Sequence, residues 1–207
     1  MNRSITSKSD YAFSNSNPGF LHPFFEKTIQ AWLNIETRPR VADVGCGNGS
    51  LCRFLKDEGF DVYGVEPGRQ GFQMACESHP DIRFYHLGVD DDGRDLPRVD
   101  AVVTTEVVEH LFLPRALPRF CKQIIEPGGT VLVSTPYHGW LKNTLIAASG
   151  MWDNHHNPLW DYGHVKFWSR ATLTRLFEEQ GFVCEGFRGH GRIPGLWKTM
   201  MLMFRAP

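Results

Sequence analysis

The spacing of apolar side chains changes near residue 40. Residues 1–19 are rich in Ser and Asn, and residues 20–35 place apolar side chains three and four positions apart, as on one face of a helix. Beyond residue 40, short apolar stretches alternate with amphipathic ones. The predicted strands are residues 40–44, 61–66, 82–86, 99–104, 130–134, 182–187 and 197–204, and the predicted helices between them are residues 50–58, 70–77, 114–125 and 169–180. Repeated strand–helix units predict right-handed crossovers and a mostly parallel sheet with helices on both faces.

Length and charge limit the classes of protein that fit. A chain of 207 residues suits one compact domain, taken as residues 1–207, and is too short for two full cores. The formal net charge is −1, so no net positive field attracts nucleic acid or an anionic membrane. We expect no membrane span, because no apolar run approaches the roughly 20 residues that one needs, and no signal peptide. The five cysteines form no Cys-X-X-Cys pair, which favours a reducing compartment, and we expect a cytoplasmic protein.

A glycine-rich stretch follows the first predicted strand. Residues 41–49 read Val-Ala-Asp-Val-Gly-Cys-Gly-Asn-Gly and lie at a strand-to-helix junction. Glycines there allow a tight turn and close approach to a ligand, and helix N–H groups point at its anionic end. Glu66 ends the second predicted strand, where a carboxylate can accept hydrogen bonds from two ribose hydroxyls. Together these features indicate a nucleoside-type cofactor; the structural alternative is a glycine turn beside an ordinary acid.

Four stretches of the sequence match a known family in the order in which that family carries them. They are Asp-Val-Gly-Cys-Gly-Asn-Gly at 43–49, Val-Tyr-Gly-Val-Glu-Pro at 62–67, Asp-Ala-Val-Val-Thr-Thr-Glu-Val-Val-Glu-His-Leu at 100–111 and Glu-Pro-Gly-Gly-Thr-Val-Leu-Val-Ser-Thr-Pro at 126–136. With them the chain resembles the class I S-adenosylmethionine-dependent methyltransferases, specifically the families similar to ubiquinone-biosynthesis O-methyltransferases. The resemblance implies a Rossmann-like, doubly wound α/β fold of seven strands in the order 3-2-1-4-5-7-6, with the last strand antiparallel. It also implies S-adenosylmethionine as the cofactor and S-adenosylhomocysteine as its product.

The resemblance further implies a set of cofactor-binding residues at the ends of the first four strands. Glu66 would bind the ribose hydroxyls, and Asp43 would order the glycine loop or bind the methionyl amino group. Asp90, or a neighbour among residues 88–92, would reach the adenine amino group, and Pro67 would lie against the adenine. Glu106 would lie beside the sulfonium, or is a plain strand-end acid. The full set is Asp43, Gly45, Cys46, Gly47, Gly49, Glu66, Pro67, Asp90 and Glu106.

Two histidines are candidates for the base that removes a proton from a hydroxyl acceptor. His110 follows the fourth predicted strand in the pair Glu109-His110, and its structural alternative is to brace the site. His164 comes from a segment expected to fold over the acceptor, and we prefer it as the base, with a structural role in a lid as the alternative. The rest of catalysis is positioning, because methyl transfer needs acceptor, methyl and sulfur in line.

Residues 137–168 differ in composition from the rest of the chain, with four tryptophans and four histidines. We expect this aromatic and His-rich insertion, together with the N-terminal residues 1–38, to cover the acceptor. Its aromatic faces suit a flat or sugar-like acceptor and the charge of a sulfonium; the alternative is a lid packed with aromatic side chains. No metal is predicted, although one alternative set of ligands is present. That set is Asp153, His155, His156, Asp161 and His164, and its spacing is not diagnostic.

The sequence therefore predicts methyl transfer from S-adenosylmethionine to a small molecule, with a hydroxyl oxygen as the favoured acceptor atom. Arg192 and Lys198 flank Pro194-Gly195 and are either contacts for an acidic acceptor or surface charges. A dinucleotide-dependent oxidoreductase is an alternative, against which the Gly-X-Gly-X-Gly spacing argues. A non-catalytic S-adenosylmethionine-binding protein is another. Nucleic acid is not expected as a substrate, because no Asn-Pro-Pro-Tyr or Asp-Pro-Pro-Tyr tetrad follows the fourth strand. The oligomeric state stays open.

Overall fold

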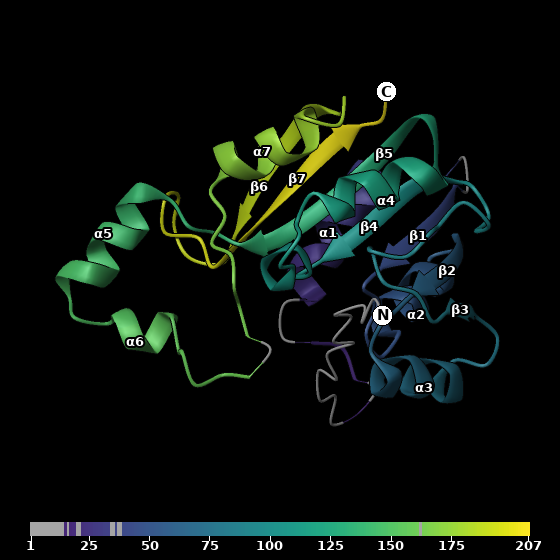
Figure 1. Ribbon diagram of the computed structural model, residues 1–207, viewed down its shortest axis with the longest axis horizontal. Helices are drawn as coiled ribbons and strands as arrows, with labels where there is room; N and C mark the ends of the chain where they lie inside the picture. The colour runs from purple at the N-terminus through teal and green to yellow at the C-terminus, as the bar shows by residue number, and fades with distance from the viewer. Residues whose placement is uncertain (1–14, 16, 20–21, 34–35, 37–38, 162) are drawn as a thin grey trace, which may run out of the picture.

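The computed structural model describes residues 15, 17–19, 22–33, 36, 39–161 and 163–207 (Figure 1). The helices are α1 (His22–Trp32), α2 (Ser50–Asp57), α3 (Arg69–Ser78), the 3-10 helix η2 (Val108–His110), α4 (Ala116–Ile124), α5 (Trp140–Ala148), α6 (Trp152–His155) and α7 (Arg170–Glu178). The strands are β1 (Arg40–Val44), β2 (Asp61–Val65), β3 (Arg83–Tyr85), β4 (Val99–Thr105), β5 (Ile125–Pro136), β6 (Val183–His190) and β7 (Thr199–Arg205). Every predicted strand is present. The predicted N-terminal helix is confirmed for His22–Trp32, whereas residues 20, 21, 34 and 35 lie outside the described residues.

The seven strands form one sheet in the order β3-β2-β1-β4-β5-β7-β6, which confirms the predicted topology. β1, β2, β3, β4 and β5 run parallel to their neighbours, and β7 runs antiparallel to both β5 and β6. β5 is longer than predicted, because it begins at Ile125 opposite Val99 and resumes regular pairing only at Thr130 opposite Ala101. The residues between these two pairs form an irregularity at the end of the sheet remote from the glycine loop.

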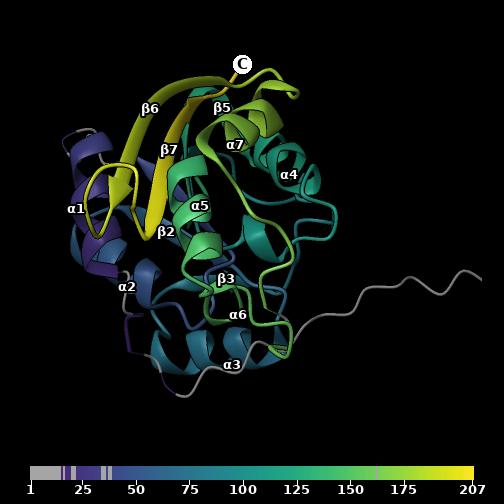
Figure 2. The same ribbon diagram turned by 90° about the vertical axis from the view of Figure 1, so that its left-hand side faces the viewer.

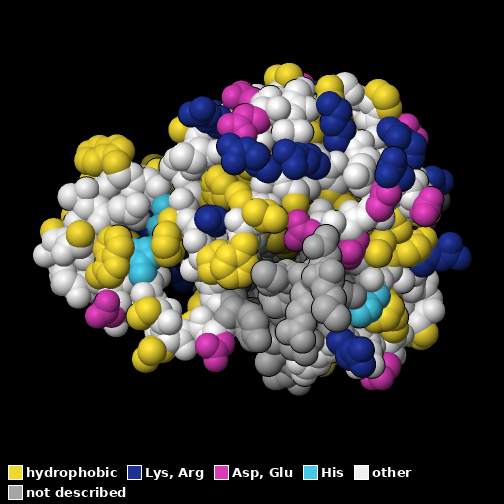
Figure 3. Space-filling view, viewed as in Figure 1, with side chains coloured by type: hydrophobic (Ala, Val, Ile, Leu, Met, Phe, Trp, Pro, Cys, Tyr) yellow, Lys and Arg dark blue, Asp and Glu magenta, His cyan; other side chains and the backbone are white. Residues whose placement is uncertain are grey.

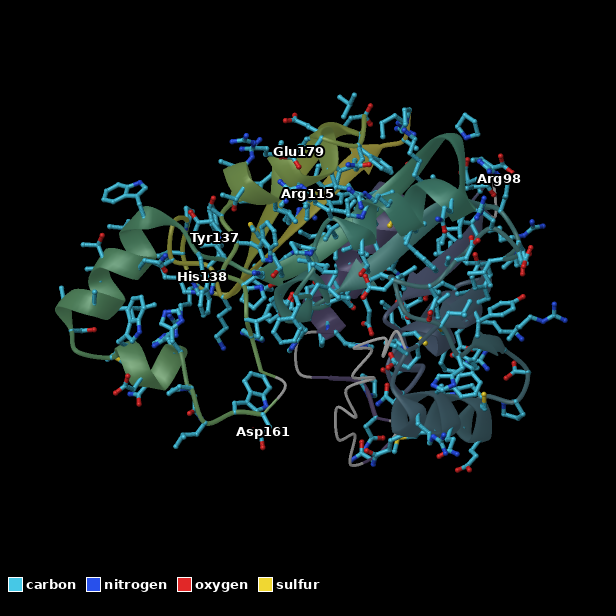
Figure 4. The ribbon with its side chains drawn as sticks, in the orientation of Figure 1. Arg98, Arg115, Tyr137, His138, Asp161 and Glu179 are labelled. Carbon is cyan, nitrogen blue, oxygen red and sulfur yellow. The ribbon has the colours of Figure 1, made fainter. Side chains whose placement is uncertain are left out.

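Helices cover both faces of the sheet (Figure 2). Phe25 and Ile29 of α1 pack with Leu51 and Leu55 of α2 on one face. The corresponding buried residues of α4 and α7 lie on the other face and include Leu117, Phe120, Leu173 and Phe177. α7 begins where the Ser169 hydroxyl accepts a hydrogen bond from the Thr172 N–H at 3.2 Å, which satisfies one free donor of the first turn. Arg115, before α4, pairs with Glu179 after α7 at 2.7 Å (Figure 4).

The insertion at 137–168 contains two helices that the sequence pattern did not predict. α5 and α6 project beyond the end of β5 and away from the sheet (Figure 1). Both ends of the insertion return to the body, since Tyr137 and Trp168 form an isolated parallel bridge and the His138 N–H donates to the Trp168 carbonyl at 2.9 Å. Trp140 is 80% exposed, so this tryptophan lines no closed pocket in the structure. That the insertion covers an acceptor stays a prediction.

None of the helices formed by the described residues has the length and apolar character required to cross a membrane. That residues 1–207 form one domain stays a prediction, and most of the N-terminal arm, residues 1–14 and 16, lies outside the described part of the chain.

Candidate functional site

The register of the sheet brings three predicted site segments to one edge. Val44, the last residue of β1, pairs with Val65, the last residue of β2, and Asp43 pairs with Val103 near the end of β4. The residues that follow these strands therefore emerge side by side at the carboxyl edge of the sheet. Ligands of open α/β sheets bind at this edge, where the strand order reverses.

The glycine loop after β1 has a backbone that only glycine adopts without strain. Gly45, Gly47 and Gly49 have φ of +79°, +53° and +78°. The Gly45 and Cys46 N–H groups both donate to the Val65 carbonyl, at 2.8 and 3.1 Å, which holds the loop against the end of β2. A Cβ on Gly45 would lie under 3.0 Å from a methyl group of Val107, a separation that real Cβ atoms essentially never show. The loop is thus pressed against the residues that follow β4.

Glu66 is tied to the same loop by both carboxylate oxygens. Oε2 accepts the Gly47 N–H at 2.8 Å and Oε1 accepts the Gly68 N–H at 2.7 Å. The side chain is buried, and burial raises the pKa of Glu66 despite the two N–H donors. Each carboxylate oxygen has a further lone pair, so the two bonds leave acceptor capacity for ribose hydroxyls. The sequence did not reveal that Glu66 also orders the glycine loop.

The two residues predicted to contact adenine lie after β2 and β3. The Pro67 carbonyl is 2.9 Å from Nε2 of His86. Asp90 is exposed, whereas its neighbour Asp91 accepts the Gly88 N–H at 2.7 Å and so shapes this turn. The adenine roles of Pro67 and Asp90 stay predictions.

Asp43 and Cys46 are buried beside the glycine loop. Asp43 is 1% exposed; its Oδ2 accepts the Cys52 thiol at 3.3 Å, and its Oδ1 has no hydrogen-bond partner in the structure. Burial raises the pKa of Asp43 to about 7 and that of the Cys46 thiol to about 11. A thiol held protonated in this way is unreactive, so Cys46 contributes packing and backbone rather than a nucleophile.

Glu106 follows β4 in a conformation unusual for its residue type. Its φ is +56°, and non-glycine residues in this region are strained and cluster at functional sites. Oε1 accepts hydrogen bonds from the Ser134 hydroxyl at 2.9 Å and the Thr199 hydroxyl at 2.8 Å. Burial raises the pKa of Glu106 to about 7. β5 and β7 thus fix the carboxyl group that the sequence predicted to lie beside the sulfonium.

The two candidate bases meet in space, together with an acid that the sequence analysis did not select. One ligand atom from each of Glu109, His110 and His164 lies within 4.8 Å of the others, and the two imidazole centroids are 5.0 Å apart. His164 is brought there by the backbone, because the Val165 and Lys166 N–H groups donate to the Glu109 carbonyl at 2.9 and 3.0 Å. Burial lowers the pKa of His164 to about 4, so its imidazole is neutral at pH 7.

Glu109 is the most deeply buried member of this Glu109–His110–His164 cluster. It is 1% exposed, its Oε2 accepts the Thr135 hydroxyl at 2.9 Å, and its Oε1 has no hydrogen-bond partner in the structure. Burial raises the pKa of Glu109 well above its usual range, and repulsion from Glu106 adds to the shift. The one sequence signal for Glu109 was its position directly before His110.

Four acids of the edge share an electrostatic property. Each has a pKa raised by burial, three are buried and Glu106 is half-buried, and none takes part in an ion pair within 4 Å with a basic side chain of the described residues. They are Asp43, Glu66, Glu106 and Glu109. Buried carboxylates without a cation are costly, so a positively charged ligand would be favoured at this edge.

The alternative set of metal ligands is not brought together. Asp161 lies on the exposed loop that leads back from α6 (Figure 4), and His155 Nδ1 is 3.1 Å from the Met151 carbonyl oxygen in its own helix. Among the described residues, the three-ligand arrangement with the spacing of a metal site is the Glu109–His110–His164 cluster. Its carboxylate and imidazoles suit a divalent ion such as zinc.

Comparisons with known proteins show the family to which the chain belongs. A family model described as "Methyltransferase domain" matches residues 19–185. A ubiquinone biosynthesis O-methyltransferase of Chromobacterium violaceum is 26% identical over 160 residues, which cover 75% of this chain and 69% of the relative. That of Bradyrhizobium diazoefficiens is 34% identical over 131 residues, covering 61% of this chain and 50% of the relative. The chain thus spans between half and about two thirds of the length of these two relatives.

Solved structures with the same fold are more distant in sequence. A magnesium protoporphyrin IX methyltransferase of Synechocystis, crystallised with S-adenosylhomocysteine, matches with a TM-score of 0.66 at 17% identity, covering 92% of this chain and 89% of the other. A methyltransferase of Haloferax volcanii in complex with its activator Trm112 matches with a TM-score of 0.68 at 19% identity, covering 90% and 92%. At these identities the likeness concerns the fold.

Proposed function

The chain belongs to the family of methyltransferase domains, and from this premise we propose that it transfers a methyl group from S-adenosylmethionine to a hydroxyl oxygen of a small-molecule acceptor, with His164 as the general base. The observation that carries the proposal is the meeting of His110, His164 and buried Glu109 beside the loop that follows β4. The same loop touches the glycine cradle through Val107. Methyl donor and proton acceptor would therefore be held at adjacent points of one edge.

The glycine cradle and the buried acids fit the proposed donor. The loop at Gly45, Gly47 and Gly49 has no side chains and uses conformations that would be strained for other residues, so a ligand can approach its backbone. Glu66 has acceptor capacity for a ribose, and the carboxyl groups of Asp43 and Glu106, which form no ion pair within 4 Å among the described residues, favour the methionyl ammonium and the sulfonium. S-adenosylmethionine, when bound, supplies an electrophilic methyl group on its sulfonium.

The chain's own part in catalysis is to place the acceptor and accept its proton. At pH 7 the His164 imidazole is neutral, so one ring nitrogen can take a proton from a hydroxyl group that lies within hydrogen-bond reach. One carboxyl oxygen of Glu109 lies within 4.8 Å of a nitrogen of each ring, so a positive charge on His164 would favour the ionised form of Glu109, whose pKa burial otherwise raises. His110, edge-on to His164, would orient the ring. The Trp160 ring, 5.0 Å from that of His164, would limit access of water.

Substitution of the two histidines tests the base. His164→Ala is expected to lower kcat by about 100-fold, the usual contribution of a general base, while leaving the affinity for S-adenosylhomocysteine unchanged in calorimetry. His155→Ala is the matched control, because His155 lies in the same insertion, outside the Glu109–His110–His164 cluster, and its Nδ1 is 3.1 Å from the Met151 carbonyl oxygen. If His164→Ala and His110→Ala both leave turnover within about threefold of the wild type, base catalysis by either is wrong and positioning alone remains.

Two further measurements separate the alternatives. Titration with S-adenosylmethionine, S-adenosylhomocysteine and NADH should show binding of the first two alone; binding of the donor without turnover on any hydroxylated acceptor would favour a non-catalytic protein.

Activity should also survive dialysis against EDTA. Loss of activity that a divalent ion restores would reassign the Glu109–His110–His164 cluster from proton transfer to metal binding.

A further inference from the structure

Lys142 is a lysine in an unusual place. It lies in the first turn of α5 and is 7% exposed, although it belongs to a helix whose Trp140 is mostly in solvent. Its Nζ donates to the Tyr137 carbonyl at 2.8 Å and, at the outer limit of a hydrogen bond, to the Lys198 carbonyl at 3.5 Å. Lysine is almost never buried to this degree unless its charge is paired. The ammonium group of Lys142 has only neutral oxygens as partners.

No carboxylate of the described residues pairs with this ammonium. None of the ion pairs within 4 Å among the described residues involves Lys142, whose pKa is lowered by the charge of Arg192 and raised by that of Glu106. Glu106 is committed to the hydroxyls of Ser134 and Thr199. Burial, helped by Arg192, lowers the pKa of Lys142 to about 8, so at pH 7 the group still carries its charge.

Arg192 lies in a different part of the fold, and its backbone conformation is also unusual. It lies in the turn between β6 and β7 with φ of +66°, in the left-handed region that disfavours a side chain of its type. This turn contacts α5, since a Cβ on Gly195 would lie 3.4 Å from Leu141. Arg192 also forms no ion pair within 4 Å among the described residues. Arg192 is thus near enough to lower the pKa of Lys142, and neither cation forms an ion pair within 4 Å with an acid of the described residues.

The position of Lys142 links the two halves of the site. Glu106 at the carboxyl edge of the sheet attracts the Lys142 charge, and the same charge helps to lower the pKa values of His138 and His156 of the insertion. Figure 4 shows His138 beside Tyr137, where β5 leads into the insertion. In the space-filling view, histidine side chains lie among hydrophobic ones on this lobe (Figure 3). A group held by Lys142 would therefore lie between the donor edge and the aromatic insertion.

We propose that Lys142 and Arg192 bind an anionic group, a carboxylate or a phosphate, of the acceptor. The inference rests on the proposed function only in assigning the anion to the acceptor. An anion at this point supplies the missing counter-charge to a buried ammonium and relieves the repulsion between two cations, whereas a neutral acceptor does neither. Lys142 is then a specificity-determining residue, remote from the proton transfer at His164.

Inorganic phosphate is the first probe, because its binding is measured without turnover. Calorimetric titration of the protein saturated with S-adenosylhomocysteine is expected to show phosphate binding that Lys142→Met weakens by about tenfold or more, the effect of one lost charge-assisted hydrogen bond. Lys122→Met is the matched control, since Lys122 also donates from a helix to a backbone carbonyl but is exposed. Arg192→Gln serves as a second variant if Lys142→Met does not fold. Equal affinity of both site variants and the wild type, or no phosphate binding by the wild type, overturns the proposal.

Pairs of acceptors that differ only in a carboxylate then test whether the bound anion belongs to the acceptor. The kcat/KM for 3,4-dihydroxybenzoate is compared with that for catechol, and 4-hydroxybenzoate with phenol, in the wild type and in Lys142→Met. We expect the wild type to prefer the carboxylates and Lys142→Met to lose this preference through KM. Methylation of both members of a pair without preference refutes the inference and leaves the proposed function intact. Phosphate binding that depends on Lys142, with no hydroxyl acceptor methylated, supports the anion site and contradicts the proposed function.

Discussion

Gly45 provides a direct measure of how closely the glycine loop is held against the residues after β4. Gly45→Ala adds a Cβ at φ of +79°, and that atom would lie under 3.0 Å from Val107. The left-handed conformation costs about 1 kcal/mol for alanine once the lower entropy of the unfolded chain is included. Overlap in a packed region adds about 1–3 kcal/mol. We therefore expect a loss of about 2–4 kcal/mol in the free energy of unfolding.

The chain offers a control that separates these two terms. Gly59 has φ of +93° and nothing within 4 Å of an added Cβ, so Gly59→Ala should cost only the conformational part, about 1 kcal/mol. Urea unfolding of both variants measures the difference, and Val107→Ala combined with Gly45→Ala should recover at least about 1 kcal/mol in a double-mutant cycle. Calorimetry should show weaker binding of S-adenosylhomocysteine for Gly45→Ala alone. If Gly45→Ala and Gly59→Ala destabilise equally, the contact between the loop and Val107 does not exist.

Two further predictions concern the buried acids. Glu66→Gln places an amide N–H₂ group opposite the backbone N–H of either Gly47 or Gly68. Binding of S-adenosylhomocysteine should therefore weaken by about 1–3 kcal/mol in calorimetry. Unchanged affinity would contradict both roles of Glu66, in ordering the glycine loop and in binding the ribose. Burial raises the pKa of Asp43 from 3.8 to about 7, so the folded state holds a proton that the unfolded state has lost between these values. The free energy of unfolding of the unliganded wild type, relative to that of Asp43→Asn, should therefore fall by a few kcal/mol as the pH rises from about 4 to about 7 and then level off. Urea unfolding at several pH values measures this difference. A difference that does not change with pH would show that the pKa of Asp43 is not raised.

The elements that could be predicted from the sequence are those whose burial follows a local pattern. β4 reads as an apolar run because both of its faces are covered, and the loop at Gly45 reads as a turn because of its residue types. α5 has no such pattern. In this helix Lys142 is buried, whereas Trp140 and Leu145 are exposed, so the usual link between polarity and burial is reversed. Pattern reading therefore missed both the helix and its one buried charge.

The same distinction between local pattern and three-dimensional packing applies to the candidate site residues. His110 and His164 were named from the sequence, but their proximity depends on hydrogen bonds between residues more than fifty positions apart in the chain, from Val165 and Lys166 to the Glu109 carbonyl. Glu109 had only its position before His110 as a signal, since its partner Thr135 lies on β5 and its burial is a property of the packed sheet. Non-local contacts of this kind cannot be read from residue types. The roles of the predicted cofactor residues accordingly remain predictions, although the fold places most of them at one edge.

The charged residues differ between the region proposed to bind the methyl donor and the region proposed to bind the acceptor. In the proposed function the carboxyl groups of Asp43 and Glu106 would lie on the donor side, and the cations Lys142 and Arg192 would lie on the acceptor side. In methyl transfer to an oxygen anion, the positive charge of the sulfonium and the negative charge of the oxygen both diminish as the new bond forms. An ammonium group that binds a carboxylate or phosphate far from the reacting oxygen does not interact with this changing charge. It therefore binds the ground state and the transition state equally. Such uniform binding lowers KM without raising kcat. Loss of Lys142 should therefore raise KM for an anionic acceptor at constant kcat, whereas loss of His164 should lower kcat at constant affinity, and the two variants report on separable functions of one site.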